Sequence, residues 1–98
     1  MAVPENRLTP QQRERRTVRR RALADALIMA RREAGLTQTE LAEAAGMSRS
    51  AIARLENSTA SIASDALWDI AVALGMRPSQ LFAAAEADAA ARDTLDGV

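Results

Sequence analysis

The sequence predicts an all-α fold, with five short helices and an N-terminal helical extension. Large apolar residues recur at spacings of three and four, which is typical of helices that bury one face. The apolar segments begin at capping residues, and most of them end at a glycine. Trp68 and Phe82 are the only aromatic residues of the 98, whereas β-sheets favour aromatic and β-branched side chains.

The first predicted helix covers residues 10–34. Thr9 and Gln12 have the spacing of a capping box, and Gly35 ends the helix. Its apolar face is formed by residues three or four apart, with Val18 joining further up: Leu23, Leu27, Ala30 and Ala34. We therefore expect the packed part of this helix to begin near residue 18.

The next two predicted helices are short, and they cover 38–45 and 48–57. Thr37 with Glu40 forms a capping box at the start of the first. Gly46 can adopt the left-handed conformation that ends it, and Ser48 caps the second. Helices of this length are unstable in isolation. They are therefore either the wall of a helical bundle, or their mutual angle is itself functional.

Two further helices complete the predicted domain. We expect Ser64 to cap the fourth and Gly75 to end it. Its apolar stripe consists of Leu67, Ile70, Ala71 and Leu74. Pro78 opens the fifth helix, which we expect to place both Leu81 and Phe82 in the core.

The composition argues against an enzyme and against a metal site. The chain has no cysteine, no histidine and no lysine, so every basic residue is arginine. Disulfides and thiolate ligands are excluded, and a nucleophilic serine would lack a base. We expect no cofactor. No apolar run approaches the roughly 20 residues of a membrane span, and the N-terminus lacks a signal-peptide core. These features indicate an intracellular protein.

The charges are separated along the chain. Residues 1–57 contain 11 Arg and 7 acidic residues, whereas residues 58–98 contain 2 Arg and 6 acidic residues. Arginine suits two-bonded contacts with phosphates and base edges. The N-terminal half is therefore the half that we expect to meet an anion.

The segment QTELAEAAGMSRSAIARLEN, residues 38–57, has a steric pattern that fits two crossing helices. Ala42 is small where the helices cross, and the inner face of the second helix is formed by Met47, Ile52 and Leu55. This pattern resembles the helix-turn-helix of the Cro/repressor-like (XRE) family. The resemblance runs from about Leu23 to Phe82, through GLTQTELAEAAGMS, IARLEN and LWDIAVALGM. It implies a repressor-like DNA-binding domain of five helices, with helix 48–57 in the major groove.

The resemblance also implies roles for individual residues. The base-reading positions are Arg49, Ser50 and Arg54. The phosphate-binding positions are Gln38, Thr39, Ser48 and Asn57. A structural ion pair is expected between Arg31 and Glu56. Because arginine pairs best with O6 and N7 of guanine, we predict guanines in each half-site.

The loop after helix 48–57 departs from the family, where glycine and basic residues are usual. Here the loop begins Ser58-Thr59-Ala60. A positive φ at Ser58 would cost roughly 1 kcal/mol, and phosphate contacts are lost with the basic residues. The Arg-rich stretch 13–21 would compensate for these lost contacts if it follows the phosphates of the DNA backbone. Its alternatives are a minor-groove arm and a surface that docks an acidic partner.

We expect three parts: an Arg-rich N-terminal extension (1–16, with a disordered lead over 1–8), a helix-turn-helix domain (17–85) and an acidic tail (86–98) that frays. The candidate dimer contacts are Trp68, Arg77, Gln80 and Leu81. Trp68 alternatively lies half-buried in the core.

The resemblance implies a transcriptional regulator, a repressor that binds a palindromic operator in double-stranded DNA as a homodimer. It further implies a cytoplasmic, nucleoid-associated protein of bacterial or phage origin. Two alternatives stay open. One is the antitoxin of a toxin–antitoxin pair that regulates its own promoter. The other is a protein-interaction module with vestigial DNA binding.

Overall fold

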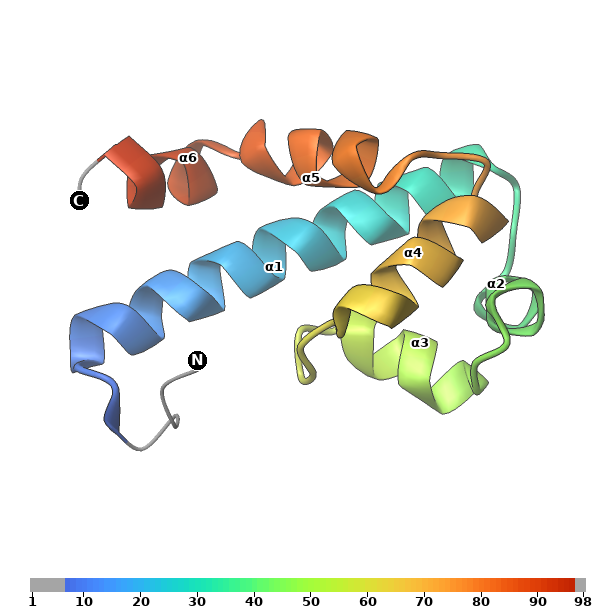
Figure 1. Ribbon diagram of the computed structural model, residues 1–98, viewed down its shortest axis with the longest axis horizontal. Helices are drawn as coiled ribbons and strands as arrows, with labels where there is room; N and C mark the ends of the chain where they lie inside the picture. The colour runs from blue at the N-terminus through green and yellow to red at the C-terminus, as the bar shows by residue number, and fades with distance from the viewer. Residues whose placement is uncertain (1–6, 97–98) are drawn as a thin grey trace.

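The computed structural model describes residues 7–96, which form six helices and no strand. The helices are α1 (Pro10–Glu33), α2 (Gln38–Ala45), α3 (Arg49–Glu56), α4 (Ser64–Ala73), α5 (Pro78–Glu86) and α6 (Ala89–Asp96). Helix α1 runs along the molecule, α5 and α6 lie beside it, and α2 to α4 gather near its C-terminal end (Figure 1). The predicted all-α class is confirmed.

Helix α1 begins at the predicted capping box. The Gln12 amide N–H donates to Thr9 Oγ1 (3.1 Å), and the Thr9 amide N–H donates to Gln12 Oε1 (2.8 Å). The helix continues without a break through the Arg-rich stretch 13–21. Ala34 is exposed, contrary to expectation, because it is the C-cap and its side chain lies beyond the apolar face.

The predicted disordered lead, residues 1–8, is wrong at its last residue. Residues 1–6 lie outside the described part of the chain, but Leu8 is only 6% exposed. Its carbonyl oxygen accepts a hydrogen bond of 2.8 Å from Arg13 Nη1. Leu8 therefore packs back against the start of α1.

The core has two neighbouring parts. The first joins α1, α2, α3 and α4 through Leu27, Leu41, Ala42, Ala45, Ile52, Leu55 and Ile70. The second joins α1, α4, α5 and α6 through Ala22, Ala26, Leu67, Leu81, Ala85 and Ala91. Much of the second part is alanine, which lets the helices approach closely. The first part therefore fixes the α2–α3 pair, and the second part holds the C-terminal helices on α1.

Three expectations about α4 and α5 are wrong. Ser64 is the first residue of α4 and does not cap it; the N-cap is Ala63, which makes no side-chain bond. Trp68 is 62% exposed, so it is not a core residue, because Leu67 and Ala71 take the inward positions of its helix. Phe82 is 47% exposed, whereas its neighbour Leu81 is fully buried.

The predicted fraying of the acidic tail is also wrong for residues 86–96, whereas residues 97–98 lie outside the described part of the chain. Residues 89–96 form α6, which contacts both α1 and α5. Ala91 is buried, and Arg19 of α1 donates from Nε to Thr94 Oγ1 (2.8 Å) and from Nη2 to the Thr94 carbonyl oxygen (3.1 Å). A small buried side chain and two hydrogen bonds thus hold this helix where large apolar residues are scarce.

Candidate nucleic-acid interface

Helices α2 and α3 are joined by a turn that local interactions fix at both ends. At the start of α2, the Glu40 amide N–H donates to Thr37 Oγ1 (3.1 Å), and Thr37 N–H donates to Glu40 Oε1 (3.0 Å). Gly46 ends the helix at φ 68°. The Ala51 amide N–H then donates to Ser48 Oγ (3.1 Å) at the start of α3. The capping signals of this segment predicted all three features.

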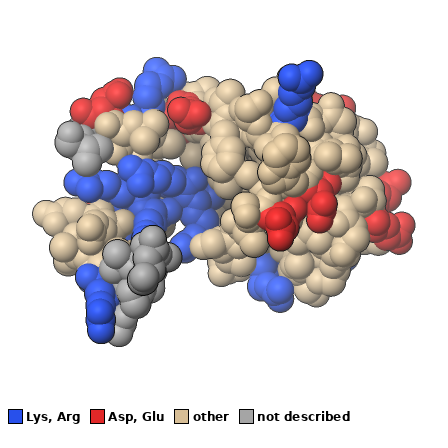
Figure 2. Space-filling model, viewed as in Figure 1, with Lys and Arg blue, Asp and Glu red and all other residues tan. Residues whose placement is uncertain are grey.

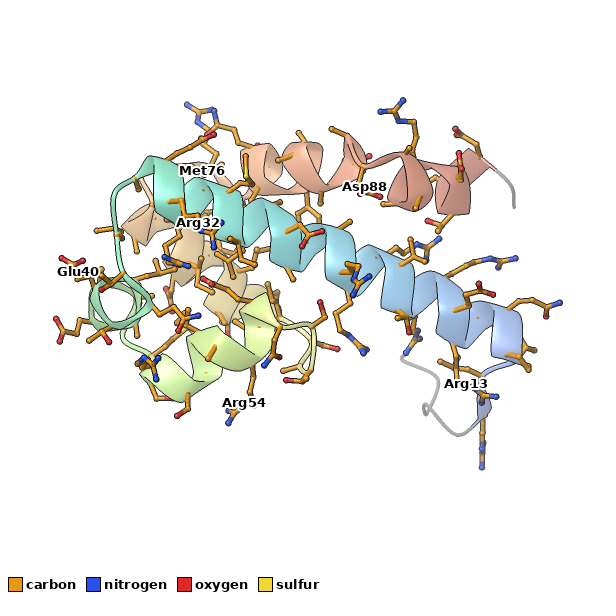
Figure 3. All side chains as sticks on the ribbon, turned by 180° about the vertical axis from the view of Figure 1, so that it is seen from behind. Arg13, Arg32, Glu40, Arg54, Met76 and Asp88 are labelled. Atoms are coloured by element: carbon orange, nitrogen blue, oxygen red, sulfur yellow. The ribbon has the colours of Figure 1, made fainter. Side chains whose placement is uncertain are left out.

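Helix α3 has one buried face and one exposed face. Ile52 and Leu55 are 0% and 5% exposed and pack into the core with α2. The predicted base-reading side chains all lie on the exposed face: Arg49, Ser50 and Arg54. Figure 3 shows Arg54 projecting from α3 away from the rest of the molecule. This face carries two guanidinium groups and is open to a large ligand.

A buried carboxylate joins the first three helices. Glu56 Oε2 accepts from Arg31 Nε (2.7 Å), and Glu56 Oε1 accepts from Arg31 Nη2 (2.9 Å) and from Gln38 Nε2 (3.1 Å). Arg31 Nη1 also donates to the Leu36 carbonyl oxygen (2.9 Å). Among residues 7–96, no buried side-chain nitrogen or oxygen lacks a partner. The orientation of α3 is thus fixed by directed bonds as well as by apolar packing.

The charge of Glu56 is stabilised in this site. Burial acts to raise its pKa, but the hydrogen bonds from Arg31 and Gln38 and the charges of Arg31 and Arg32 outweigh burial. The net effect is a lowered pKa. The same pair raises the pKa of Arg31, chiefly through the Glu56 hydrogen bond. Both groups are therefore charged at neutral pH, which keeps the pair intact.

The predicted phosphate-binding residues lie at three separate ends of α2 and α3. Gln38 and Thr39 are the first two residues of α2. Thr39 is exposed, whereas Gln38 donates one side-chain amide N–H to Glu56. Ser48 Oγ caps α3. Asn57 Oδ1 accepts from the amide N–H (3.1 Å) and Oγ1 (2.6 Å) of Thr59. The capping roles leave the second amide N–H of Gln38 and the amide group of Asn57 as donors for an anion.

Thr59 is a residue that sequence reasoning missed. Besides holding Asn57, its amide N–H donates to the Arg54 carbonyl oxygen (3.0 Å), while Ser58 N–H donates to the Leu55 carbonyl oxygen (3.3 Å). This pair of bonds is a Schellman motif, which places the residue after the C-cap in the left-handed region. Ser58 has φ 66°, so the condition under which we expected a cost at this serine is met. A polar residue two positions after Asn57 was the available signal.

The predicted dimer contacts are dispersed in the monomer. Leu81 is fully buried, so it is wrong as a contact. Gln80 Oε1 accepts from the Arg77 amide N–H (2.8 Å) and caps α5. Trp68 and Val72, four residues apart on α4, are 62% and 69% exposed. Val72 was missed, although its i+4 spacing from the tryptophan was visible in the sequence.

Two kinds of feature are absent from the described residues. Within residues 7–96, no three or more His, Cys, Asp or Glu side chains come together in a way that could hold a metal ion. None of the helices described there has the length and hydropathy needed to span a membrane.

The chain is similar to known regulators of gene expression. The helix-turn-helix family profile matches residues 27–81. Two crystal structures of the clp gene regulator ClgR from Corynebacterium glutamicum are similar to this chain. One is 29% identical with a TM-score of 0.70, covering 81% of this chain and 83% of that one. The other is 32% identical with a TM-score of 0.67, covering 70% and 90%. No curated protein matches.

The family match covers α2, α3 and α4 completely, with the end of α1 and the start of α5. It therefore includes the part of the fold that presents the exposed face of α3. The chain belongs to the XRE-type helix-turn-helix family and is a DNA-binding transcriptional regulator.

Proposed function

We propose that the protein is a repressor that binds a palindromic operator as a dimer, with α3 of each subunit in the major groove. The observation that carries this proposal is the division of α3 into a fixed buried face and an exposed face with Arg49, Ser50 and Arg54. Base reading requires side chains whose positions do not shift on binding. The Arg31–Glu56 pair supplies that rigidity from behind the helix.

Guanine is the base that this face is best suited to read. An arginine fork matches O6 and N7 of guanine with two hydrogen bonds, each such contact giving about 1–3 kcal/mol of discrimination. Arg49 and Arg54 lie at opposite ends of α3, so they would reach different base pairs. Ser50, on the first turn, fits a less selective contact to either kind of acceptor or donor.

Phosphate contacts would come mainly from neutral groups. The N-terminal turns of α2 and α3, with Gln38, Thr39 and Ser48, offer N–H and O–H donors, and Asn57 offers its amide. Neutral donors orient the protein but release no counterions. We therefore propose a binding constant whose salt dependence is set by the arginines alone.

The two-fold contact of the proposed dimer fits the exposed face of α4. Trp68 and Val72 form an apolar pair there, and Arg77 lies exposed after the helix. Tryptophan and arginine are enriched at protein interfaces. A dimer that binds a palindromic operator has to hold its two α3 helices about 34 Å apart, one turn of DNA.

The test is selection of sites from randomised duplex DNA at two salt concentrations. We expect an inverted repeat with guanines, and Arg49→Ala or Arg54→Ala to weaken binding by about 2 kcal/mol, roughly 30-fold. Arg32→Ala, which removes an exposed arginine of α1, is the control and should leave the selected sequence unchanged. If no sequence is enriched at either salt concentration, the proposed base-reading role of α3 is wrong.

Repression is tested separately with a reporter gene. The selected operator is placed over the promoter, and expression is measured with and without the protein. The similarity to the clp gene regulator ClgR from Corynebacterium glutamicum supports a role at promoters. A fall in expression supports repression, whereas a rise would indicate an activator.

A further inference from the structure

A groove between α1, α5 and α6 is not used by DNA binding as proposed. It has a volume of about 660 Å³. The N-terminal half of α1 forms one wall, α5 and α6 form the second, and residues 60–62 after α3 form the third. Figure 2 shows arginine side chains gathered over this half of α1, beside α6. The groove is large enough for a small organic molecule, because such sites measure roughly 300–1,000 Å³.

The groove is apolar over most of its surface. Leu23, Leu55 and Ile62 line its inner part, with the alanines of α1, α5 and α6 beside them. Phe82 and Leu95 line it as well, although they are 47% and 52% exposed. Two large apolar side chains that line one groove and remain half exposed are what a bound apolar group would cover.

The charged side chains of the groove are mostly cationic. Three arginines line it, Arg16, Arg19 and Arg20, against the single carboxylate Glu86. Arg19 is held in place by two hydrogen bonds to Thr94, 2.8 Å from Nε and 3.1 Å from Nη2. Arg20 is half-buried on the same wall. A cationic wall beside an apolar floor selects a molecule with an anionic head and an apolar body.

We propose that this groove is an effector site for a small amphipathic anion, a carboxylate or phosphate with an aliphatic body. A nucleic acid fits the groove poorly, because its backbone is charged throughout and would leave the apolar floor unfilled. The anionic head would lie against Arg19 and Arg20, and the aliphatic body against Leu23, Phe82 and Leu95.

The groove also touches the recognition helix, which makes it suitable for control. Leu55 belongs to α3, and residues 60–62 follow the left-handed turn at Ser58 that ends α3. A ligand that packs on Leu55 and residues 60–62 would favour one placement of α3 relative to α1 over another. Any such difference changes DNA affinity, typically by 5- to 150-fold, and DNA changes ligand affinity by the same factor. This coupling rests on the proposed function, whereas ligand binding itself does not.

The first experiment is calorimetric titration of the full chain with decanoate, without DNA. We expect saturable binding, roughly tenfold weaker for octanoate because two buried methylenes are lost. Decylammonium, which reverses the head charge, should not bind. Arg20→Gln and Phe82→Ala should each weaken decanoate binding at least tenfold. The matched control is Arg21→Gln, an exposed arginine of α1 that does not line the groove.

Several results would overturn the site. One is that decanoate shows no saturable binding, and another is that decylammonium binds as tightly as decanoate. A third is that Arg20→Gln and Arg21→Gln lose the same amount of decanoate affinity. Circular dichroism of each variant separates lost binding from lost folding. The second experiment measures operator affinity with and without decanoate. Unchanged affinity with saturable binding would remove the effector role and keep the site, and Arg49→Ala, which should lose operator binding, should still bind decanoate.

Discussion

The guanidinium of Arg31 and the carboxylate of Glu56 form a two-bonded ion pair, with Nε–Oε2 at 2.7 Å and Nη2–Oε1 at 2.9 Å. The two side chains are only 12% and 6% exposed. Arg31 lies in the last turns of α1, and Glu56 is the last residue of α3. The pair therefore joins the scaffold helix directly to the helix that we propose reads DNA.

Breaking this pair should cost more than breaking a surface ion pair. Glu56→Ala leaves a largely buried guanidinium without its partner, which typically costs about 3 kcal/mol or more. Urea denaturation should show this loss in the free energy of unfolding. Glu43→Ala, which removes an exposed carboxylate of α2, is the control and should change stability by less than about 0.5 kcal/mol. Equal losses in both variants would contradict a special role for the pair.

Acid should weaken the fold through the same carboxylate. The folded-state pKa of Glu56 lies below its ordinary value, because bonds and charges from Arg31, Gln38 and Arg32 outweigh the effect of burial. Its stabilisation is therefore complete above the ordinary glutamate pKa, about 4.3, and is lost as pH falls through the folded pKa. Thermal unfolding should show a falling midpoint over this range, and Glu56→Gln should make the fall smaller.

Glu40 contributes in the same direction, because bonds from the backbone and side chain of Thr37 lower its pKa. The variant with both Glu56→Gln and Glu40→Gln should therefore have the flattest profile. A profile as steep as that of the wild-type protein in the double variant would show that other carboxylates control the acid transition.

The turn after α3 should be stabilised by glycine. Ser58 has φ 66°, the only positive φ among the described non-glycine residues. Left-handed backbone costs a residue with a Cβ roughly 1 kcal/mol, so Ser58→Gly should raise the free energy of unfolding by about that amount. Ser61→Gly, in the same loop but outside the left-handed region, should have no such benefit. A destabilised Ser58→Gly would mean that the serine side chain outweighs the strain.

Local structure was the most predictable part of this protein. Thr9, Thr37 and Ser48 accept the capping hydrogen bonds that the sequence predicted, and Gly46 ends α2 in the left-handed conformation. These interactions span at most four residues, so they depend little on the rest of the fold. The positive φ at Ser58 was predictable for the same reason, since it follows from how a short helix ends.

The errors at Trp68 and Phe82 concern which face of a helix meets its neighbours. Leu81 and Phe82 are adjacent apolar residues, and only the packing of α5 on α1 decides that the first is buried. The exposed face of α3 was predictable from residues 38–57, because the capping and apolar pattern that fixes the turn between α2 and α3 lies within this one segment. The groove between α1, α5 and α6 was not, because it is made by helices far apart in sequence.

The docking of α6 provides a stability test of the second part of the core. Ala91 is 7% exposed and packs in the cluster with Leu81 and Ala85. Ala91→Asp would bury a charge without a partner, and we expect a loss of about 3 kcal/mol in the free energy of unfolding. Ala90→Asp, one residue earlier on the exposed face, should have little effect. Equal stability of the two variants would mean that α6 does not pack on α1 in solution.

The last prediction concerns the proposed dimer face of α4. Trp68 and Val72 are 62% and 69% exposed, and both would be covered by a partner subunit. Each substitution occurs twice in a two-fold contact, so its effect on dimerisation is doubled. Trp68→Ser with Val72→Ser should weaken dimerisation by at least about 2 kcal/mol, roughly 30-fold, as for other interface hot spots.

Sedimentation equilibrium measures this change directly, and circular dichroism checks that the helices remain. The control is Met29→Ser, which removes a 58% exposed apolar side chain from α1. The control should remain a dimer and bind the full operator, whereas the α4 variant should bind full and half operators with similar affinity, because only a dimer gains from the second half-site. A dimer that survives the α4 substitutions would move the interface to another surface, while leaving the base-reading role of α3 intact.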